Sequence, residues 1–139
     1  PMSSRKQLLL LVFVVFFIAQ LPNKIFGDPL FCNEGISFGF QFKSPVLLLL
    51  LAIGAIVPMA FLWKVRPSEE KASLKILIFG ESLLIGGAAS NFFDRLHFGC
   101  IPDFFQVVSF FPAFNIADVG ISLGAVLIFF SLVKKNTEK

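Results

Sequence analysis

The chain has 139 residues, of which 56% are hydrophobic and only 15% are charged, and its mean hydropathy is +0.84. These values exclude an ordinary soluble domain, a disordered chain, a disulfide-stapled miniature domain and a coiled coil. The formal net charge of +3 does not indicate a nucleic-acid partner, because most basic residues flank apolar runs. The sequence therefore predicts an integral membrane protein.

Four apolar stretches are candidates for membrane-spanning helices, for which a bilayer requires about 20 helical residues. Pro58 lies inside the second stretch and predicts a kink there. The chain is expected to form a single membrane domain over residues 1–139, an all-α bundle of four transmembrane helices. The predicted spans cover residues 7–25, 46–63, 74–90 and 114–133, with outer segments at 26–45 and 91–113.

The first apolar stretch has a second interpretation as a secretory signal peptide. Arg5 and Lys6 would form its basic region, and residues 8–19 its apolar region. However, no cleavage site of the Ala-x-Ala type follows the apolar run. We therefore favour a first helix that stays in the protein.

The distribution of basic residues predicts the orientation, because Lys and Arg near the ends of spans are retained in the cytoplasm. With four spans, nine of the twelve basic residues fall on one side. That side holds both termini, which are therefore predicted to be cytoplasmic, and the outer segments face away from the cytoplasm. The nine are Arg5, Lys6, Lys64, Arg66, Lys71, Lys75, Lys134, Lys135 and Lys139, against Lys24, Lys43 and Arg95 on the outer side.

Ionisable residues in or beside a span are functional candidates, since a charge facing lipid is costly. Asp118 lies near the start of the last span and has to face protein or water. Asn115 and Ser122 share its helical face, and Gly120 and Gly124 form a G-x-x-x-G pair that indicates close helix packing. The ionisable residues that need an explanation are Glu81, Asp94, Arg95, Asp103 and Asp118.

The outer segment 91–113 is apolar for a loop, so we expect it to lie on the membrane surface. Residues 101–108 have the β-branched and aromatic content of a short strand. That strand would carry Asp103 at the membrane face, at the depth where Asp118 begins the last helix. The sequence thus predicts two carboxylates at the same level of the bundle.

Such a pair has a specific chemistry when it converges in a cleft of low dielectric constant, because one carboxyl then keeps a proton near neutral pH. The ionised member can activate a water against a peptide carbonyl, and the protonated member can stabilise the oxyanion. This aspartic proteolysis requires no metal or other cofactor. From spacing alone, the pair could equally bind a cation, relay protons or form a salt bridge with Arg95.

Four ordered sequence blocks resemble those of bacterial lipoprotein signal peptidase, the signal peptidase II family. Residues 91–95 read Asn-Phe-Phe-Asp-Arg, like its N-x-x-D-R block, and residues 101–104 read Ile-Pro-Asp-Phe, like V-x-D-F. Residues 114–118 read Phe-Asn-Ile-Ala-Asp, like F-N-x-A-D, and residues 33–39 are similar to N-x-G-x-x-F-G. The resemblance covers nearly the whole chain.

The resemblance implies an aspartyl endopeptidase in the bacterial inner membrane. Its partners would be membrane lipids and the signal peptide of a prolipoprotein, cut just before a diacylglyceryl-modified cysteine. The catalytic dyad would be Asp103 and Asp118, with the active site on the extracytoplasmic side, under a small β-cradle and a surface lid. We expect a monomer, because one chain supplies both aspartates. The residues implied to support the dyad or bind substrate are Asn33, Asn91, Arg95 and Asn115.

The chain departs from the family pattern at the end of its first helix. The family has Asp-Gln-x-x-Lys there, whereas this chain has Gln20 in place of the Asp and keeps the Lys as Lys24. We expect this change to affect stability or substrate docking and not chemistry. It leaves open a catalytically inactive homologue that only binds lipoproteins. A proton-coupled carrier, in which Glu81 and Asp118 relay protons, is the other alternative.

Two further patterns concern the cysteines. Asp94, His97, Cys100 and Asp103 recur at every third residue, like metal ligands, but Gly99 and Pro102 interrupt any helix that would align all four, so we expect no metal site. Cys32 and Cys100 both lie in the outer segments, where a disulfide is permitted but not implied by the count alone.

Overall fold

The computed structural model describes residues 3–34 and 72–137 of the chain, which form three long helices and one two-stranded sheet. The predicted span 46–63 and residues 35–45 of the first outer segment fall outside these ranges. The helices are α1 (Ser4–Ile25), α3 (Ala72–Phe98) and α4 (Ile116–Thr137), and the strands are β1 (Phe31–Asn33) and β2 (Ile101–Asp103).

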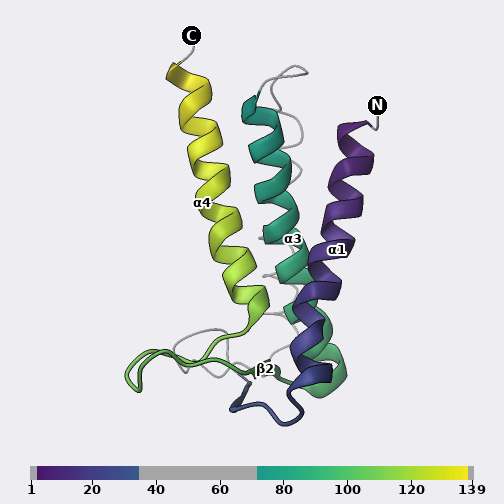
Figure 1. Ribbon diagram of the computed structural model, residues 1–139, viewed down its shortest axis with the longest axis vertical. Helices are drawn as coiled ribbons and strands as arrows, with labels where there is room; N and C mark the ends of the chain where they lie inside the picture. The colour runs from purple at the N-terminus through teal and green to yellow at the C-terminus, as the bar shows by residue number, and fades with distance from the viewer. Residues whose placement is uncertain (1–2, 35–71, 138–139) are drawn as a thin grey trace.

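Helix α3 lies between α1 and α4 and packs against both (Figure 1). The start of α1 and the end of α4 lie at the same end of this bundle, and the sheet lies at the opposite end (Figure 1). Helices α1 and α3 run towards the sheet, whereas α4 runs away from it. The residues nearest the sheet are therefore the last turns of α1 and α3 and the first turn of α4.

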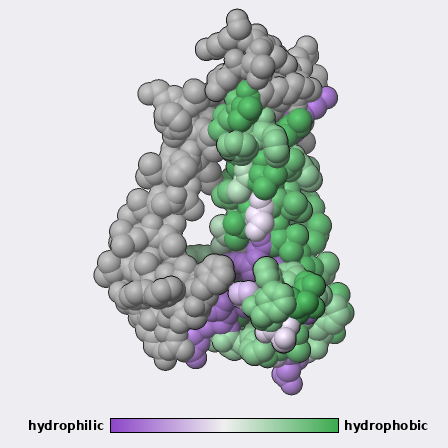
Figure 2. Space-filling model, turned by 90° about the vertical axis from the view of Figure 1, so that its left-hand side faces the viewer, coloured by the Kyte–Doolittle hydropathy of each residue, from purple (hydrophilic) through white to green (hydrophobic). Residues whose placement is uncertain are grey.

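All three described helices are long and apolar enough to cross a bilayer. Their outer faces expose large hydrophobic side chains, such as Phe13 and Phe17 on α1 and Phe129 and Phe130 on α4. Figure 2 shows this hydrophobic surface running along the length of the molecule. Because a soluble protein would bury such residues, these faces are suited to lipid.

Glycines allow α3 to approach both neighbours closely. A Cβ atom at Gly124 of α4 would lie 2.6 Å from the carbonyl oxygen of Gly80 in α3, and one at Gly87 would lie 2.6 Å from that of Ala117. On the other side, a Cβ at Gly86 would lie 2.7 Å from the Cβ of Val15 in α1. The close packing expected at Gly124 is confirmed.

Helix α3 continues to Phe98, although the sequence predicted a span that ends at residue 90. No helix breaker occurs before Gly99, which has a positive φ of 77° and whose N–H donates to the carbonyl of Arg95 at 3.0 Å. The polar residues Asn91 and Asp94 favoured an outer loop, but both are buried on α3. They face the bundle and not water.

Strands β1 and β2 pair antiparallel at the sheet end of the bundle, with Phe31 opposite Asp103 and Asn33 opposite Ile101. Strand β2 is shorter than the predicted strand over 101–108, because the chain turns away after Asp103. Phe105 instead exchanges two backbone hydrogen bonds with Phe114, at 3.1 and 2.9 Å. The residues between them form a closed loop that leads into α4.

Candidate active site

The first turn of α4 places one of the two predicted carboxylates. Asn115 precedes the helix, and its Oδ1 accepts a hydrogen bond from the backbone N–H of Asp118 at 3.0 Å. In return, Oδ2 of Asp118 accepts from the backbone N–H of Asn115 at 3.2 Å. This reciprocal pair is a capping box, which satisfies backbone donors at the helix start and fixes both side chains.

Helix α3 contributes Asn91 to the same group of side chains. Its Nδ2 donates to Oδ1 of Asp118 at 2.8 Å, and its Oδ1 accepts from Nδ2 of Asn115 at 3.1 Å. Both oxygens of Asp118 therefore accept hydrogen bonds from N–H donors. The close α3–α4 packing at Gly87 and Ala117 brings the two helices near enough for these contacts.

Strand β2 ends on the second carboxylate, Asp103, which is 2% exposed. Its Oδ1 accepts from Nδ2 of Asn115 at 3.2 Å. The side chain of Asn33, from β1, also forms a hydrogen bond with this carboxyl. A single residue, Asn115, thus donates to both carboxyls: to that of Asp103 from its side chain and to that of Asp118 from its backbone N–H.

Arg95 supplies positive charge to the two carboxylates. It lies one helical turn after Asn91 on α3 and interacts electrostatically with both Asp103 and Asp118. The six residues predicted from the sequence, from four separate elements, therefore converge at one end of the bundle. They are Asn33, Asn91, Arg95, Asp103, Asn115 and Asp118.

The electrostatic environment favours the protonated form of Asp103. Burial raises the pKa of Asp103 to about 6, and the charge of Asp118 acts in the same direction. The hydrogen bonds from Asn33 and Asn115 and the charge of Arg95 oppose this rise. Asp103 is therefore the member of the pair that holds a proton to higher pH than an ordinary aspartate.

A second polar cluster joins α1 to α3, and the sequence did not predict it as a unit. Gln20 Nε2 donates to Ser90 Oγ at 2.8 Å and to Asp94 Oδ1 at 2.9 Å. Asn23 Nδ2 donates to the same Asp94 oxygen at 2.9 Å. Polar pairs at spacings of three and four residues on two apolar helices were the available signal.

The structure also bears on two alternatives considered from the sequence, a metal site and a proton relay through Glu81. Cys100 forms a disulfide with Cys32, so its sulfur is not available for the metal site considered with Asp94 and His97. Within residues 3–34 and 72–137, no three His, Cys, Asp or Glu side chains are grouped as metal ligands. Glu81 is buried in α3, ten residues before Asn91 and hence about 15 Å along the helix from that residue.

Comparison with known proteins relates the chain to a family of membrane peptidases. The family model described as signal peptidase (SPase) II matches residues 6–134. The chain is 37% identical over 138 residues to a lipoprotein signal peptidase of Chlorobaculum parvum, covering 86% of this chain and 82% of that protein. It is 35% identical over 109 residues to a lipoprotein signal peptidase of Lactococcus lactis, covering 77% and 69%.

The fold comparison agrees with the sequence comparison. A solved structure of a bacterial membrane enzyme superposes with a TM-score of 0.70 at 25% sequence identity. The match covers 96% of this chain and 91% of the other. The bundle and its sheet end are thus similar to those of a known membrane enzyme.

Proposed function

The chain belongs to the signal peptidase II family, and from this membership we propose that it is an intramembrane aspartyl endopeptidase. Its substrates are diacylglyceryl-modified prolipoproteins, and it cuts just before the lipidated cysteine. Family membership implies a peptidase for lipoprotein signal peptides. The observation that supports an aspartic mechanism is the convergence of Asp103 and Asp118 on Asn115.

In this mechanism the two carboxyls divide the acid and base roles. Asp103 enters the reaction protonated, as its raised pKa favours, and donates a hydrogen bond to the carbonyl oxygen of the scissile peptide bond. Asp118 lies in the first turn of α4 and accepts hydrogen bonds from two N–H donors. It takes a proton from the attacking water. The tetrahedral intermediate then collapses as the leaving amine receives a proton from the pair.

The neighbouring residues orient the pair and offset its charge. Asn91 and Asn115 hold the carboxylates at a fixed geometry, which is the main requirement for efficient proton transfer. Arg95 offsets the negative charge that develops during the reaction. Asn33 binds Asp103 from the opposite strand and lies where an extended substrate would pass.

The proposed substrate reaches the site from the bilayer. The helix faces that lead to the site are apolar, and the loop after β2 exposes Phe110 at 88% and Val107 at 75%. Figure 2 shows hydrophilic surface at the end of the hydrophobic helix face, next to this loop region. We assign the loop and the sheet to the β-cradle and surface lid, and the bilayer lipids contact their apolar side chains.

The positions of the described elements support the proposed topology. Strand β1 lies at the sheet end, whereas α3 begins at the opposite end (Figure 1). The sequence between them contains the apolar run 46–63. We assign this run as the second of four spans, with both termini cytoplasmic and the site on the extracytoplasmic side of the inner membrane.

The test is a gel-shift cleavage assay with the purified full-length protein in lipid and a diacylglyceryl-modified prolipoprotein. We expect the wild-type protein to release a product that begins at the lipidated cysteine, and Asp103→Asn to release none. Glu81→Gln serves as the control, since Glu81 is a buried acid on the same helix bundle but remote from the pair. We expect this control variant to cleave at the wild-type rate.

Two outcomes would contradict the proposal. A folded wild-type protein that binds the substrate without cleaving it would favour an inactive, lipoprotein-binding homologue. Equal loss of activity in Glu81→Gln and Asp103→Asn would instead favour proton relay along the bundle. Either result would remove the assignment of Asp103 as the catalytic acid.

A further inference from the structure

The strand pair that carries Asp103 is short and depends on few backbone contacts. Strands β1 and β2 have three residues each and form the whole described sheet. An isolated two-stranded ribbon is at best marginally stable, and these strands are not joined by a tight turn. The hydrogen bonds between them therefore hold β1 against β2 only weakly.

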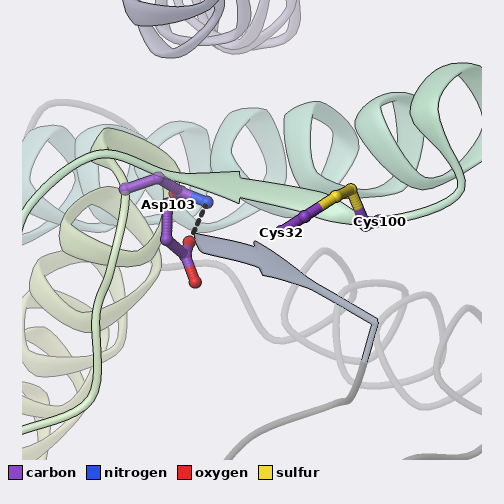
Figure 3. Close-up of a disulfide and its surroundings, with 4 residues drawn as sticks. Cys32, Cys100 and Asp103 are labelled. Carbon is purple, nitrogen blue, oxygen red and sulfur yellow. Dashed lines mark hydrogen bonds between the residues drawn. A yellow bond between two sulfur atoms is a disulfide. The ribbon is translucent and has the colours of Figure 1, made fainter. Parts of the chain in front are cut away.

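A disulfide crosses this ribbon close to the site. Cys32 lies in β1 and Cys100 directly precedes β2, with a Cα–Cα distance of 5.5 Å and a sequence separation of 68. Figure 3 shows the disulfide near the start of β2 and Asp103 at its end. Cys100 is 2% exposed and follows the turn at Gly99 that ends α3, so one end of the link is anchored on the bundle.

The pairing register relates this bond to the carboxylate. Side chains alternate between the two faces of a strand, so Cys32 projects to one face of β1 and Asn33 to the other. Asn33 shares its face with Asp103, to which it is hydrogen bonded. The disulfide on one face of β1 thus holds this strand in place, and Asn33, the residue after Cys32, binds the carboxyl of Asp103 on the other face.

We propose that the Cys32–Cys100 disulfide positions Asp103 for catalysis by holding Asn33 against it, so that the peptidase loses activity when this bond is reduced. This inference rests on the proposed function. Cys32 and Cys100 are positioning residues that do not touch the substrate. Once the link is broken, β1 separates from β2 and Asp103 loses the Asn33 hydrogen bond.

The redox step is a thiol–disulfide exchange. The thiols of Cys32 and Cys100 give two electrons and two protons to the disulfide of an oxidised partner. The partner's S–S bond breaks to give two thiols, and one S–S bond forms in the protein. Reduction is the reverse, through a mixed disulfide. Such exchange is favourable outside the cytoplasm, where the proposed topology places both cysteines. The enzyme would therefore reach full activity only after the sheet end has left the reducing cytosol.

The experiment compares oxidised and reduced full-length wild-type protein in lipid, with a phosphine reductant that leaves the thioether of the substrate cysteine intact. We expect reduction to lower kcat by about tenfold, because Asp103 is no longer held in its reactive geometry, with a smaller change in KM. The double variant Cys32→Ala/Cys100→Ala is the matched control. It should have the reduced activity and be insensitive to the reductant.

The pH profile separates positioning from a purely structural role. Because the Asn33 hydrogen bond lowers the pKa of Asp103, its loss should move the basic limb of the rate profile to higher pH. Oxidised Asn33→Ala should show the same shift, and reduction should not add to it. Equal kcat and pH profiles in the oxidised and reduced wild-type protein, or a loss of activity that accompanies unfolding of the bundle, would overturn the inference. Absence of cleavage by the oxidised wild-type protein would instead overturn the proposed function.

Discussion

Asn115 has two separable tasks, one structural and one at the candidate site. Its Oδ1 caps α4, whereas its Nδ2 donates to Asn91 and Asp103. Asn115→Ala removes both, and we expect it to cost about 1 kcal/mol of stability as well as activity. Asn115→Ser keeps a capping oxygen but lacks the amide donors.

We therefore expect Asn115→Ser to melt near the wild-type temperature in detergent, yet to cleave prolipoprotein at least about tenfold more slowly. Thermal melting and the cleavage assay check the two effects independently. Wild-type activity in Asn115→Ser would show that the contact with Asp103 has no role in the reaction.

The raised pKa of Asp103 gives stability a pH dependence with a definite sign. The folded state holds the proton up to a pKa of about 6, whereas the unfolded chain releases it near the ordinary aspartate pKa of 3.8. The folded protein thus gains stability as the pH falls below about 6 and loses that gain as the pH rises from about 4 to 6. Asp103→Asn abolishes this contribution.

We expect the melting temperature of Asp103→Asn to exceed that of the wild-type protein above pH 6. The difference should shrink as the pH is lowered towards 4, in melting curves recorded across that range. A difference that does not vary with pH would mean that Asp103 is not a perturbed carboxyl in the folded protein.

Gln20 stands where the resemblance predicts an acidic residue, and its contacts suit a neutral side chain at this position. As a neutral amide, it donates to the buried Asp94. Gln20→Asp would set a second carboxylate beside the first, so we expect a lower melting temperature at neutral pH than for wild type. Gln20→Glu keeps the side-chain length and tests whether charge is the cause. A variant Gln20→Asp as stable as wild type would contradict this explanation.

The sequence identified the six residues of the candidate site because their blocks are short and ordered. It did not identify the contacts of Gln20 and Asn23 with Asp94, because these depend on how α1 and α3 face each other. Spacing along one helix can place residues on a common face. It does not specify which face of the next helix they meet.

Helix packing between α3 and α4 depends on glycine unequally at the two positions of the G-x-x-x-G pair. A Cβ at Gly124 would lie 2.6 Å from a backbone oxygen of α3, whereas one at Gly120 would lie 3.4 Å from the backbone oxygen of Leu83. Gly124→Ala therefore requires the helices to separate, at a cost of about 1–3 kcal/mol. Gly120→Ala should be nearly neutral.

Melting temperatures of the two variants in the same detergent check this difference. Gly124→Ala should also reduce cleavage, since separating α3 from α4 moves Asn91 away from Asp118. Equal stability of the two variants would show that the backbones do not approach as closely as described.

At the level of elements, the lengths of the apolar runs predicted the helices, but they did not predict where α3 ends. The polar block at 91–95 favoured an outer loop, yet the helix ends only at Gly99, the first residue with a positive φ after Ala72. The buried polar residues of that block are hydrogen bonded to other polar side chains in the bundle, which allows them to be buried on a helix. Strand β2 is short for a similar reason, because tertiary pairing with Phe114 redirects the chain.

At the scale of the whole molecule, composition and basic-residue placement predict a membrane bundle, and the three described helices agree with a multi-pass membrane protein. The residues at the site come from sequence positions as far apart as 33 and 118, yet they meet at one end of the bundle. This convergence requires α3 to run parallel to α1 and antiparallel to α4. Hydropathy alone does not determine that arrangement. In the proposed plan of four spans, however, α1 is the first span and α3 the third, so these two helices have to run in the same direction.

The central claim is that Asp103 and Asp118 act as one catalytic unit. The most direct measurement is the kcat of Asp103→Asn, Asp118→Asn and the double variant on a lipidated prolipoprotein, with folding checked by melting. We predict that each single variant loses about 1,000-fold and that the double variant loses no more than either single variant. Losses that multiply in the double variant, or a kcat close to the wild-type value in either single variant, would contradict the claim.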